Sequence, residues 1–385
     1  MHEINATEPG TESKGVAGNF PATQPSTRLG HVPALDGLRG IAILLVMGNH
    51  APLRSFESLL PGGFAGVDLF FVLSGFLITT LLVQEFDRTG SIRLRNFYLR
   101  RALRLGPALI AMLIVYCIFS LLIYDKDRAS QNCLDSLYAL FYLTDWIRVF
   151  AGNQMGMLAH TWSLSVEEQF YILWPIILLT LLRASKKRIY IAAGAVVIGL
   201  LSWAAGIFLT AKGATFIRLC FGLDTRAETL MVGCVLGVVF SSGLMTEKAA
   251  NLARKILAFL APAALLCLII FSITGDFLGR GLFTFGFVVI ALLAATLILD
   301  VMINPRSMLK KLLTAKWLVW LGAISYGLYL WHWPIYWGMH GFGYKGWTVV
   351  LIGTPLTFLA VLPSYYFLEK PILKLKRRFM DDRHA

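Results

Sequence analysis

The sequence contains few charged side chains for its length. Only 15% of its 385 residues are Asp, Glu, Lys or Arg, whereas about 25% is usual in a soluble domain. Hydrophobic residues make up 57% of the chain, compared with about 45–50% in soluble proteins. This composition excludes an ordinary soluble domain and is typical of a protein that lies in a membrane.

Cysteine is also scarce, and its pattern excludes a disulfide framework. The five cysteines are an odd number, lie mainly in apolar segments and have no close paired spacing of the kind that binds a metal. We therefore expect them to be packing residues. They are Cys117, Cys133, Cys220, Cys234 and Cys267.

No cleavable signal sequence is recognisable at the start of the chain. A basic region followed by an apolar region is missing from residues 1–33, which are polar and rich in Gly, Pro, Ser and Thr. We expect these residues to form a disordered cytoplasmic tail. Residues 34–372 are predicted to form one transmembrane domain, and residues 373–385 a basic cytoplasmic tail.

Long apolar runs occur along nearly the whole chain and predict an all-α, polytopic membrane protein with about ten transmembrane helices. A helix needs about 20 apolar residues to cross the hydrocarbon. A membrane β-barrel would show short alternating segments instead of continuous runs such as 282–299. The predicted spans lie near 36–53, 64–84, 103–124, 161–182, 189–209, 222–242, 254–273, 281–302, 317–338 and 346–368.

The net charge of +13 indicates orientation and not nucleic-acid binding, because Lys and Arg lie in short connections between apolar runs. With the N-terminus in the cytoplasm, the cytoplasmic connections hold 23 Lys and Arg residues and the outer connections hold 8. This asymmetry follows the positive-inside rule and predicts that both termini are cytoplasmic. It also argues against a crossing at 133–150, which we predict to be interfacial or re-entrant.

Ionisable residues inside spans are costly in a membrane and are therefore functional candidates. An inner basic layer contains Arg39, Arg101 and Arg104. Guanidinium groups bind phosphate oxygens in a bidentate manner, and the RxxR spacing places Arg101 and Arg104 on one helical face. Snorkelling anchors are the alternative explanation for these arginines. Arg39 precedes a long apolar run, which makes anchoring alone a poor explanation.

An outer layer contains a histidine and three carboxylates. His50, Asp68, Glu167 and Glu168 each lie near the predicted outer end of a span. A histidine can take a proton from an acceptor hydroxyl, and a carboxylate at its second ring nitrogen would fix the tautomer. A single structural histidine in an apolar helix is the alternative interpretation.

The spacing between Arg39 and His50 links the two layers. Eleven residues of α-helix turn through about 1100°, so the two side chains share a face. They are separated by about 16–17 Å along the helix axis. This distance is comparable with the reach of an extended phosphopantetheine arm. An acyl donor with such an arm could have its phosphates held by the inner arginines while its thioester reaches His50.

At these residues the sequence resembles acyltransferase family 3. The similarity runs from about residue 33 to 372, and the R-x10-H, RxxR and SVEEQF blocks are jointly specific. The resembling segments are LDGLRGIAILLVMGNH (35–50), GVDLFFVLSGFLIT (66–79), FYLRRALRLGPAL (97–109), HTWSLSVEEQFYILWP (160–175) and SYGLYLWHWPI (325–335).

The resemblance implies a bacterial inner-membrane O-acyltransferase of surface polysaccharides. By position, His50 resembles the essential histidine of the family, Arg39 its partner, and Glu167 the acid of the fourth block, while Arg101 and Arg104 resemble the RxxR pair. Some family members carry an extracytoplasmic hydrolase-like domain that helps to deliver the acyl group. We expect this chain to use a separate extracytoplasmic acyl-carrying protein if it requires that function.

Three further groups of residues have a structural interpretation beside a functional one. Arg226 and Glu228 are predicted to form an ion pair that joins helices or lines the acceptor path. Ser163 and Ser165 lack the surroundings of a nucleophile and are predicted to pack and form hydrogen bonds. His332 and Tyr329 lie in an aromatic-rich segment. We expect this segment either to form an aromatic belt at the membrane interface or to stack against a sugar.

The leading hypothesis is transfer of an acyl group, with acetyl-CoA as the acyl donor, to a saccharide hydroxyl. No metal is predicted, and both an acyl-histidine and a direct ternary complex remain open. The alternative is a transporter or flippase of polysaccharide precursors without acyl-transfer chemistry. The absence of a recognisable internal repeat argues against that alternative, as do the R-x10-H and RxxR blocks. An inactive protein that retains the fold is a third reading.

Overall fold

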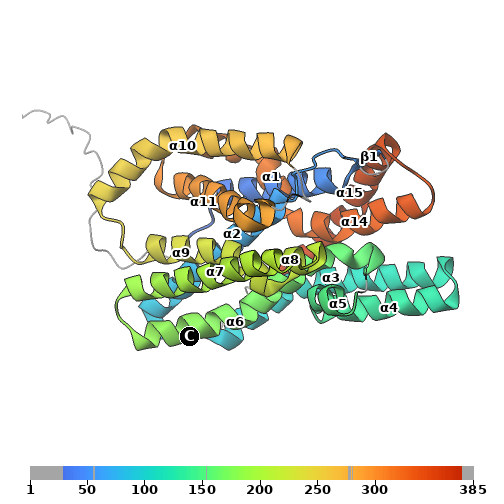
Figure 1. Cartoon of the computed structure of the whole chain (residues 1–385), viewed down its shortest axis with the longest axis horizontal. Coiled ribbons are helices and arrows are strands. Elements are labelled where there is room, and N and C mark those ends of the chain that lie inside the picture. Colours follow the sequence, from blue (N-terminus) through green and yellow to red (C-terminus); the bar gives the residue numbers. More distant parts are fainter. Residues whose placement is uncertain (1–28, 55–56, 153, 276–278, 280, 375–385) are drawn as a thin grey trace, which may run out of the picture.

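The computed structural model describes residues 29–54, 57–152, 154–275, 279 and 281–374, and its course is shown in Figure 1. Most of the two predicted tails, up to residue 28 and from residue 375, lies outside the described residues. The rest is built almost entirely of helices, which confirms the predicted all-α class.

Helices occupy each of the ten predicted spans. One of these spans is interrupted, at Ile324, and two contain π-helical segments. In chain order they are α1 (Pro33–His50), α2 (Ala65–Thr89), α3 (Leu94–Ile123), α6 (Trp162–Ala184), α7 (Arg188–Ala211), α9 (Leu223–Ser241), α10 (Glu247–Thr274), η2 (Leu282–Gly286) with α11 (Phe287–Ile303), α13 (Lys316–Ala323) with α14 (Ser325–Gly341), and η3 (Val349–Gly353) with α15 (Thr354–Pro363) and η4 (Ser364–Glu369).

Among the described residues, seven helices are long and apolar enough to cross a membrane. The remaining predicted spans are shorter or more polar than these seven. Helix α1 has 18 residues and contains Asp36 and Arg39, while α9 contains three charged residues near its start. Helix α14 has 17 residues and follows a break at Ile324. Three of these charged residues, Arg39, Arg226 and Glu228, are ones that the sequence already singles out.

Shorter elements connect these helices. Strands β1 and β2 form a small antiparallel hairpin between α1 and α2. The stretch 133–150 does not form one continuous helix, since it is divided between α4 and the seven-residue α5, which is far too short to cross a bilayer. The connecting elements are β1 (Pro52–Arg54), β2 (Glu57–Ser58), α4 (Lys126–Leu140), α5 (Thr144–Phe150), η1 (Gly156–Thr161), α8 (Phe216–Phe221) and α12 (Met308–Leu313).

Helices α2 and α9 pack closely because glycine lies at their contact. A Cβ atom on Gly233 of α9 would come within 2.2 Å of the Val72 carbonyl oxygen, and one on Gly75 of α2 would come within 2.2 Å of the Leu230 carbonyl oxygen. Gly233 and Gly237 form a GxxxG pattern, which brings helix backbones together in membranes. The same contact places Asp68 of α2 beside α9.

Helix α1, which carries Arg39 and His50, is held by both parts of the interrupted span α13–α14. Near its start it contacts α13 so closely that a Cβ on Gly322 would meet the Asp36 carbonyl oxygen at 1.8 Å. Near its end, His50 contacts α14. The two candidate residues of α1 are therefore fixed against one partner segment.

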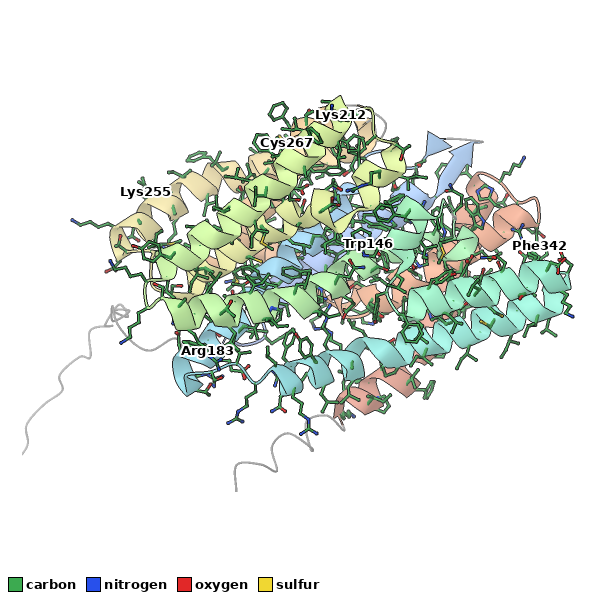
Figure 2. The ribbon with its side chains drawn as sticks, turned by 60° about the horizontal axis from the view of Figure 1, so that its bottom comes forward. Trp146, Arg183, Lys212, Lys255, Cys267 and Phe342 are labelled. Carbon is green, nitrogen blue, oxygen red and sulfur yellow. The ribbon has the colours of Figure 1, made fainter. Side chains whose placement is uncertain are left out.

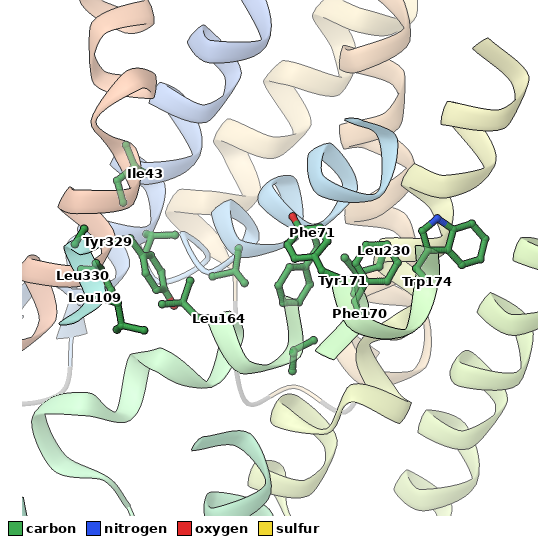
Figure 3. Packing of buried hydrophobic residues seen from close by; sticks show 14 of the residues in the cluster. Ile43, Phe71, Leu109, Leu164, Phe170, Tyr171, Trp174, Leu230, Tyr329 and Leu330 are labelled. Carbon is green, nitrogen blue, oxygen red and sulfur yellow. The ribbon is translucent and has the colours of Figure 1, made fainter. Parts of the chain in front are cut away.

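Apolar side chains from several helices fill the space around these elements. Figure 3 shows part of this core, including Phe71, Tyr171 and Trp174. Trp174 is 1% exposed, and its indole nitrogen donates a hydrogen bond of 2.8 Å to Thr79 Oγ1. The core thus attaches α6 to α2 about two helical turns beyond the carboxylates of Glu167 and Glu168.

Basic residues of two predicted cytoplasmic connections lie toward the same end of the molecule. In Figure 2, Arg183 and Lys255 lie toward one end of the long axis and Phe342 lies at the other end. This arrangement agrees with a topology in which 183–188 and 243–255 face one side of the membrane.

Candidate active site

His50 ends helix α1 and forms a hydrogen bond with a second histidine. The Nδ1 atom of His50 lies 2.7 Å from Nε2 of His332, which α14 contributes from 282 residues further along the chain. The edge of Trp333 packs against the His50 ring, with ring centroids 4.4 Å apart. No carboxylate forms a hydrogen bond with His50 among the described residues. The expectation of a carboxylate partner for His50 is therefore corrected to a histidine partner.

His332 is buried within α14 and is anchored by the backbone. Its Nδ1 atom lies 2.9 Å from the carbonyl oxygen of Leu328, one helical turn earlier. The side chain is 0% exposed. The aromatic neighbours of His332 predict a belt or sugar-stacking role, whereas an ionisable residue in an apolar span is itself a signal of function.

A third histidine lies behind this pair. His160 belongs to η1, and its ring centroid is 5.7 Å from that of His332. Its Nε2 atom lies 3.2 Å from the Leu330 carbonyl oxygen, while its buried Nδ1 atom has no hydrogen-bond partner among the described residues. No group of three or more His, Cys, Asp or Glu side chains in the described chain is arranged to hold a metal ion.

Tyr329 connects η1 and α6 to α14. Its hydroxyl donates a hydrogen bond of 2.7 Å to the His160 carbonyl oxygen, so it accepts the 2.5 Å hydrogen bond from Ser163. Ser165 accepts a hydrogen bond from the backbone nitrogen of Thr144 at 3.2 Å. The two serines thus pack and form hydrogen bonds, as their sequence context predicted.

Glu167 and Glu168 bind Arg101 and not His50. The Nε atom of Arg101 donates to Glu168 Oε1 at 2.8 Å, and its Nη2 atom lies 3.7 Å from Glu167 Oε1. The guanidinium group also lies 3.0 Å from the centre of the Tyr171 ring. Ser74 and Tyr171 donate hydrogen bonds to Glu167. The expectation that these carboxylates lie beside His50 is therefore wrong, because in the structure they bind Arg101 of the inner basic layer.

The short helix α5 forms hydrogen bonds with α6 next to the two carboxylates. Gln169, the residue after Glu168, donates from its amide to both oxygens of Asp145, at 3.0 and 3.1 Å. The indole nitrogen of Trp146 donates to the amide oxygen of Gln169 at 3.0 Å. These contacts fix the start of α6 and hence the position from which Glu167 and Glu168 reach Arg101.

Arg39 and Arg104 differ from Arg101 because neither has a hydrogen-bond or ion-pair partner in the described chain. Arg104 lies close enough to Arg39 and Arg101 to be repelled by both. The Arg104 side chain is exposed and that of Arg39 is partly exposed. Asp36 and Glu369 lie near enough to Arg104 to interact with its charge, but neither forms an ion pair with it. Two adjacent guanidinium groups that form no ion pair are a suitable site for an anion with several oxygens.

Asp68 is engaged in a buried ion pair at the contact between α2 and α9. It accepts hydrogen bonds from Arg226 and, at 3.4 Å, from Thr229. Asp68 is 0% exposed and Arg226 is 1% exposed. The expectation that Asp68 acts with His50 is corrected, because its partner is this arginine.

The predicted pair of Arg226 with Glu228 is also corrected. Glu228 instead accepts a hydrogen bond of 2.8 Å from Ser202 of α7. Because α9 is helical, side chains two residues apart point away from each other, which directs Arg226 to α2 and Glu228 to α7. The pair of residues thus joins α9 to two different helices.

Comparison with known proteins identifies the family of the chain. A family model described as an acyltransferase domain matches residues 32–369. The chain belongs to this acyltransferase family. The matched region contains Arg39 and Arg104, the hydrogen-bonded His50 and His332, and the carboxylates of Glu167 and Glu168.

Two relatives illustrate the similarity. The chain is 34% identical over 316 residues to peptidoglycan O-acetyltransferase OatA of Listeria monocytogenes, covering 79% of this chain and 49% of the relative. It is 34% identical over 357 residues to O-acetyltransferase OatA of Staphylococcus aureus, covering 89% of this chain and 57% of the relative. The chain thus spans about half the length of these relatives. No solved structure matches it.

Proposed function

We propose that this multi-pass membrane protein is an O-acyltransferase that transfers an acetyl group from acetyl-CoA to a saccharide hydroxyl. One observation carries the proposal. Helix α1 bears an unpaired guanidinium at Arg39, next to Arg104, and the imidazole of His50 about 16–17 Å further along the same helix. This spacing matches a donor with phosphates at one end and a thioester at the other.

The donor phosphates would bind at Arg39 and Arg104. Both side chains are accessible, and neither forms an ion pair in the described chain. Arg101 is the less suitable ligand, because Glu167 and Glu168 already neutralise it. In this proposal Arg101 and Glu167 hold α3 against α6 beside the phosphate site.

The reacting nitrogen would be Nε2 of His50, since its Nδ1 atom is bonded to His332. In direct transfer, the acceptor oxygen attacks the thioester carbonyl carbon while Nε2 takes the hydroxyl proton. The C–S bond then breaks, and the leaving thiolate takes that proton from the imidazolium. The products are an O-acyl ester and free coenzyme A. An acyl-histidine route would use the same nitrogen as nucleophile.

The acceptor would be a saccharide on the outer side of the membrane or linked to a lipid. Support comes from the Listeria relative, whose name describes a peptidoglycan O-acetyltransferase. The excess of Lys and Arg in one set of connections supports an inner-membrane protein with both termini cytoplasmic and the donor entering from that side. A separate extracytoplasmic acyl-carrying protein is a further proposed partner.

The test is reconstitution of the purified protein in liposomes with radiolabelled acetyl-CoA and peptidoglycan fragments or a lipid-linked saccharide. Wild-type protein should release coenzyme A and label the saccharide. His50→Ala should lose at least nine-tenths of this activity, because the reacting nitrogen is removed while α1 keeps its packing.

Gln substitution of His340, a histidine of α14 outside the site, serves as the matched control and should behave as wild type. Residual activity of His50→Ala above a tenth of wild type would contradict the assigned role. Saccharide movement across the membrane without coenzyme A release would instead support the transporter alternative.

A further inference from the structure

The two histidines at the end of α1 lie edge to edge in nearly one plane. Their ring planes differ by 7°, and their centroids are 5.1 Å apart, about the sum of the nitrogen–nitrogen distance and the two ring radii, so the bonded nitrogens lie between the centroids. The 2.7 Å distance between His50 Nδ1 and His332 Nε2 is that of a short hydrogen bond. One nitrogen must therefore donate and the other must accept.

The backbone determines which nitrogen donates. A carbonyl oxygen can only accept, so the proton at the 2.9 Å contact between His332 Nδ1 and the Leu328 carbonyl oxygen must be on Nδ1. A neutral imidazole has only one N–H, so His332 Nε2 carries a lone pair. His50 Nδ1 must then be the donor of the bond between the rings, which leaves the lone pair of neutral His50 on Nε2.

We propose that His332 is a positioning residue that fixes the tautomer of His50 and directs its Nε2 lone pair toward the reacting groups. The inference rests on the proposed function, since it assigns a role to a second residue of the same site. His332 does not touch the substrate. It acts through His50, in the way that an orienting group acts on a catalytic histidine.

The surrounding residues explain why a histidine can take this position. Charged carboxylates in a span are costly unless they are paired, and the carboxylates expected at this depth are paired elsewhere, Asp68 with Arg226 and Glu167 with Arg101. A neutral imidazole accepts the His50 proton without adding a buried charge. When His50 becomes an imidazolium, the same hydrogen bond becomes charge-assisted and stronger.

Other contacts hold the two rings in this plane. The edge of Trp333 packs on His50, and the Trp333 indole nitrogen donates to the Gly156 carbonyl oxygen at 3.2 Å. Tyr336 meets His332 at nearly a right angle, with centroids 5.9 Å apart. Trp333 therefore restricts rotation of His50, and His332 determines which nitrogen bears its proton.

The experiment compares His332→Gln with His332→Phe in the liposome assay. Glutamine can place an acceptor oxygen near the original Nε2 position, whereas phenylalanine fills the volume but accepts nothing. In His332→Phe the kcat should fall about 10- to 100-fold, as when an orienting partner of a functional histidine is lost. The KM for acetyl-CoA should change less than about threefold, because the phosphate site is separate.

His332→Gln should recover most of the lost kcat, and His340→Gln on the same helix should match wild type. Loss of activity in both His332 variants to the same degree, or full activity of His332→Phe, would overturn the proposal. If His50→Ala were fully active as well, the proposed function itself would fail. An inactive His50→Ala beside an active His332→Phe rejects only the role of His332.

Ring nitrogen spectroscopy provides a readout that does not depend on turnover. Protein with ¹⁵N-labelled histidine would be measured by NMR in detergent or nanodiscs, with His50 assigned by its loss in His50→Ala. Wild-type His50 should show a protonated Nδ1 and an unprotonated Nε2. His332→Phe should shift the population toward the Nε2–H form, and a wild-type His50 protonated on Nε2 would overturn the inference.

Discussion

Arg101 and Arg104 lie three residues apart on α3 but have different surroundings. Arg101 is bonded to Glu168 and lies over the Tyr171 ring, while Arg104 has no bonded partner in the described chain. The RxxR spacing places both side chains on one face of the helix, as the sequence predicted. Spacing alone could not show that one of them is already neutralised by carboxylates from α6.

This difference predicts separate effects of two equivalent substitutions. Arg104→Ala should weaken coenzyme A binding by about 1.5–3 kcal/mol, the range for a charged hydrogen bond, with little change in thermal stability. Arg101→Ala should lower thermal stability, because it leaves Glu167 and Glu168 without their cation. Isothermal titration and thermal unfolding in detergent would measure the two effects.

Arg39→Ala provides the matched test of the phosphate site from the other helix. It should reduce coenzyme A affinity to a degree similar to Arg104→Ala. Unchanged affinity in both variants would leave these arginines as membrane anchors.

The His50–His332 contact could not be predicted from spacing, because 282 residues separate the partners. The sequence did identify His50, and it marked the three carboxylates by their similar depth in the membrane. Depth does not determine the direction of a side chain around its helix, and each carboxylate points to an arginine instead. His332 was available as an ionisable residue in an apolar span, but its aromatic neighbours favoured a belt.

At the level of helices, α1 links Arg39 to His50 through its register. Inserting one Ala between Ile43 and Leu44 would turn His50 by about 100° relative to Arg39. His50 would then lose its contact with His332, so activity should fall nearly as far as in His50→Ala. The liposome assay would measure this, together with a check that the variant enters the membrane.

Inserting four residues at the same place provides a second measurement. The face is restored to within about 40°, while the separation grows by about 6 Å. Activity should remain low if the donor arm must span a fixed distance. An active single-Ala insertion that is properly folded would refute the link between the two residues.

The contact of α2 with α9 predicts a stability effect at Gly233. A Cβ atom there would lie 2.2 Å from the Val72 carbonyl oxygen, so Gly233→Ala forces the helices apart. The free energy of unfolding should fall by about 1–3 kcal/mol, as in other overpacked sites. The matched control is Gly106→Ala in α3, where a Cβ meets nothing within 4 Å. Thermal unfolding in detergent should separate the two, and equal stability would contradict the close contact.

Helix positions were well predicted by apolar runs, because the hydrocarbon thickness sets the length of each run. The interruption of the ninth span at Ile324 was not predicted. Ile324 is followed by Ser325, with Gly322 and Gly327 nearby, but glycine and serine also occur within uninterrupted membrane helices, and no proline lies within three residues. The break lies between two contacts with α1. Helix α13 packs against the start of α1, and α14 brings His332 to His50 at its end, so tertiary packing determines where the span is interrupted.

For the whole molecule, topology can be tested by cysteine labelling. In a background with all five native cysteines replaced by Ala, a membrane-impermeant maleimide should label Phe342→Cys in intact cells. It should label Lys255→Cys only in inverted vesicles, because the basic connection 243–255 is predicted to face the cytoplasm. Both side chains are exposed. Labelling of both variants from the same side would contradict the proposed orientation.

The attachment of α1 to both parts of the α13–α14 span has a consequence for motion. Arg39 lies near the end held by α13, and His50 is bonded to α14. A rocking movement of α9 or α10 against the rest of the bundle would therefore leave the spacing between the two sites unchanged. Alternating access moves a cargo by changing such spacings, whereas a stationary pair of sites requires only that the donor arm enter and leave.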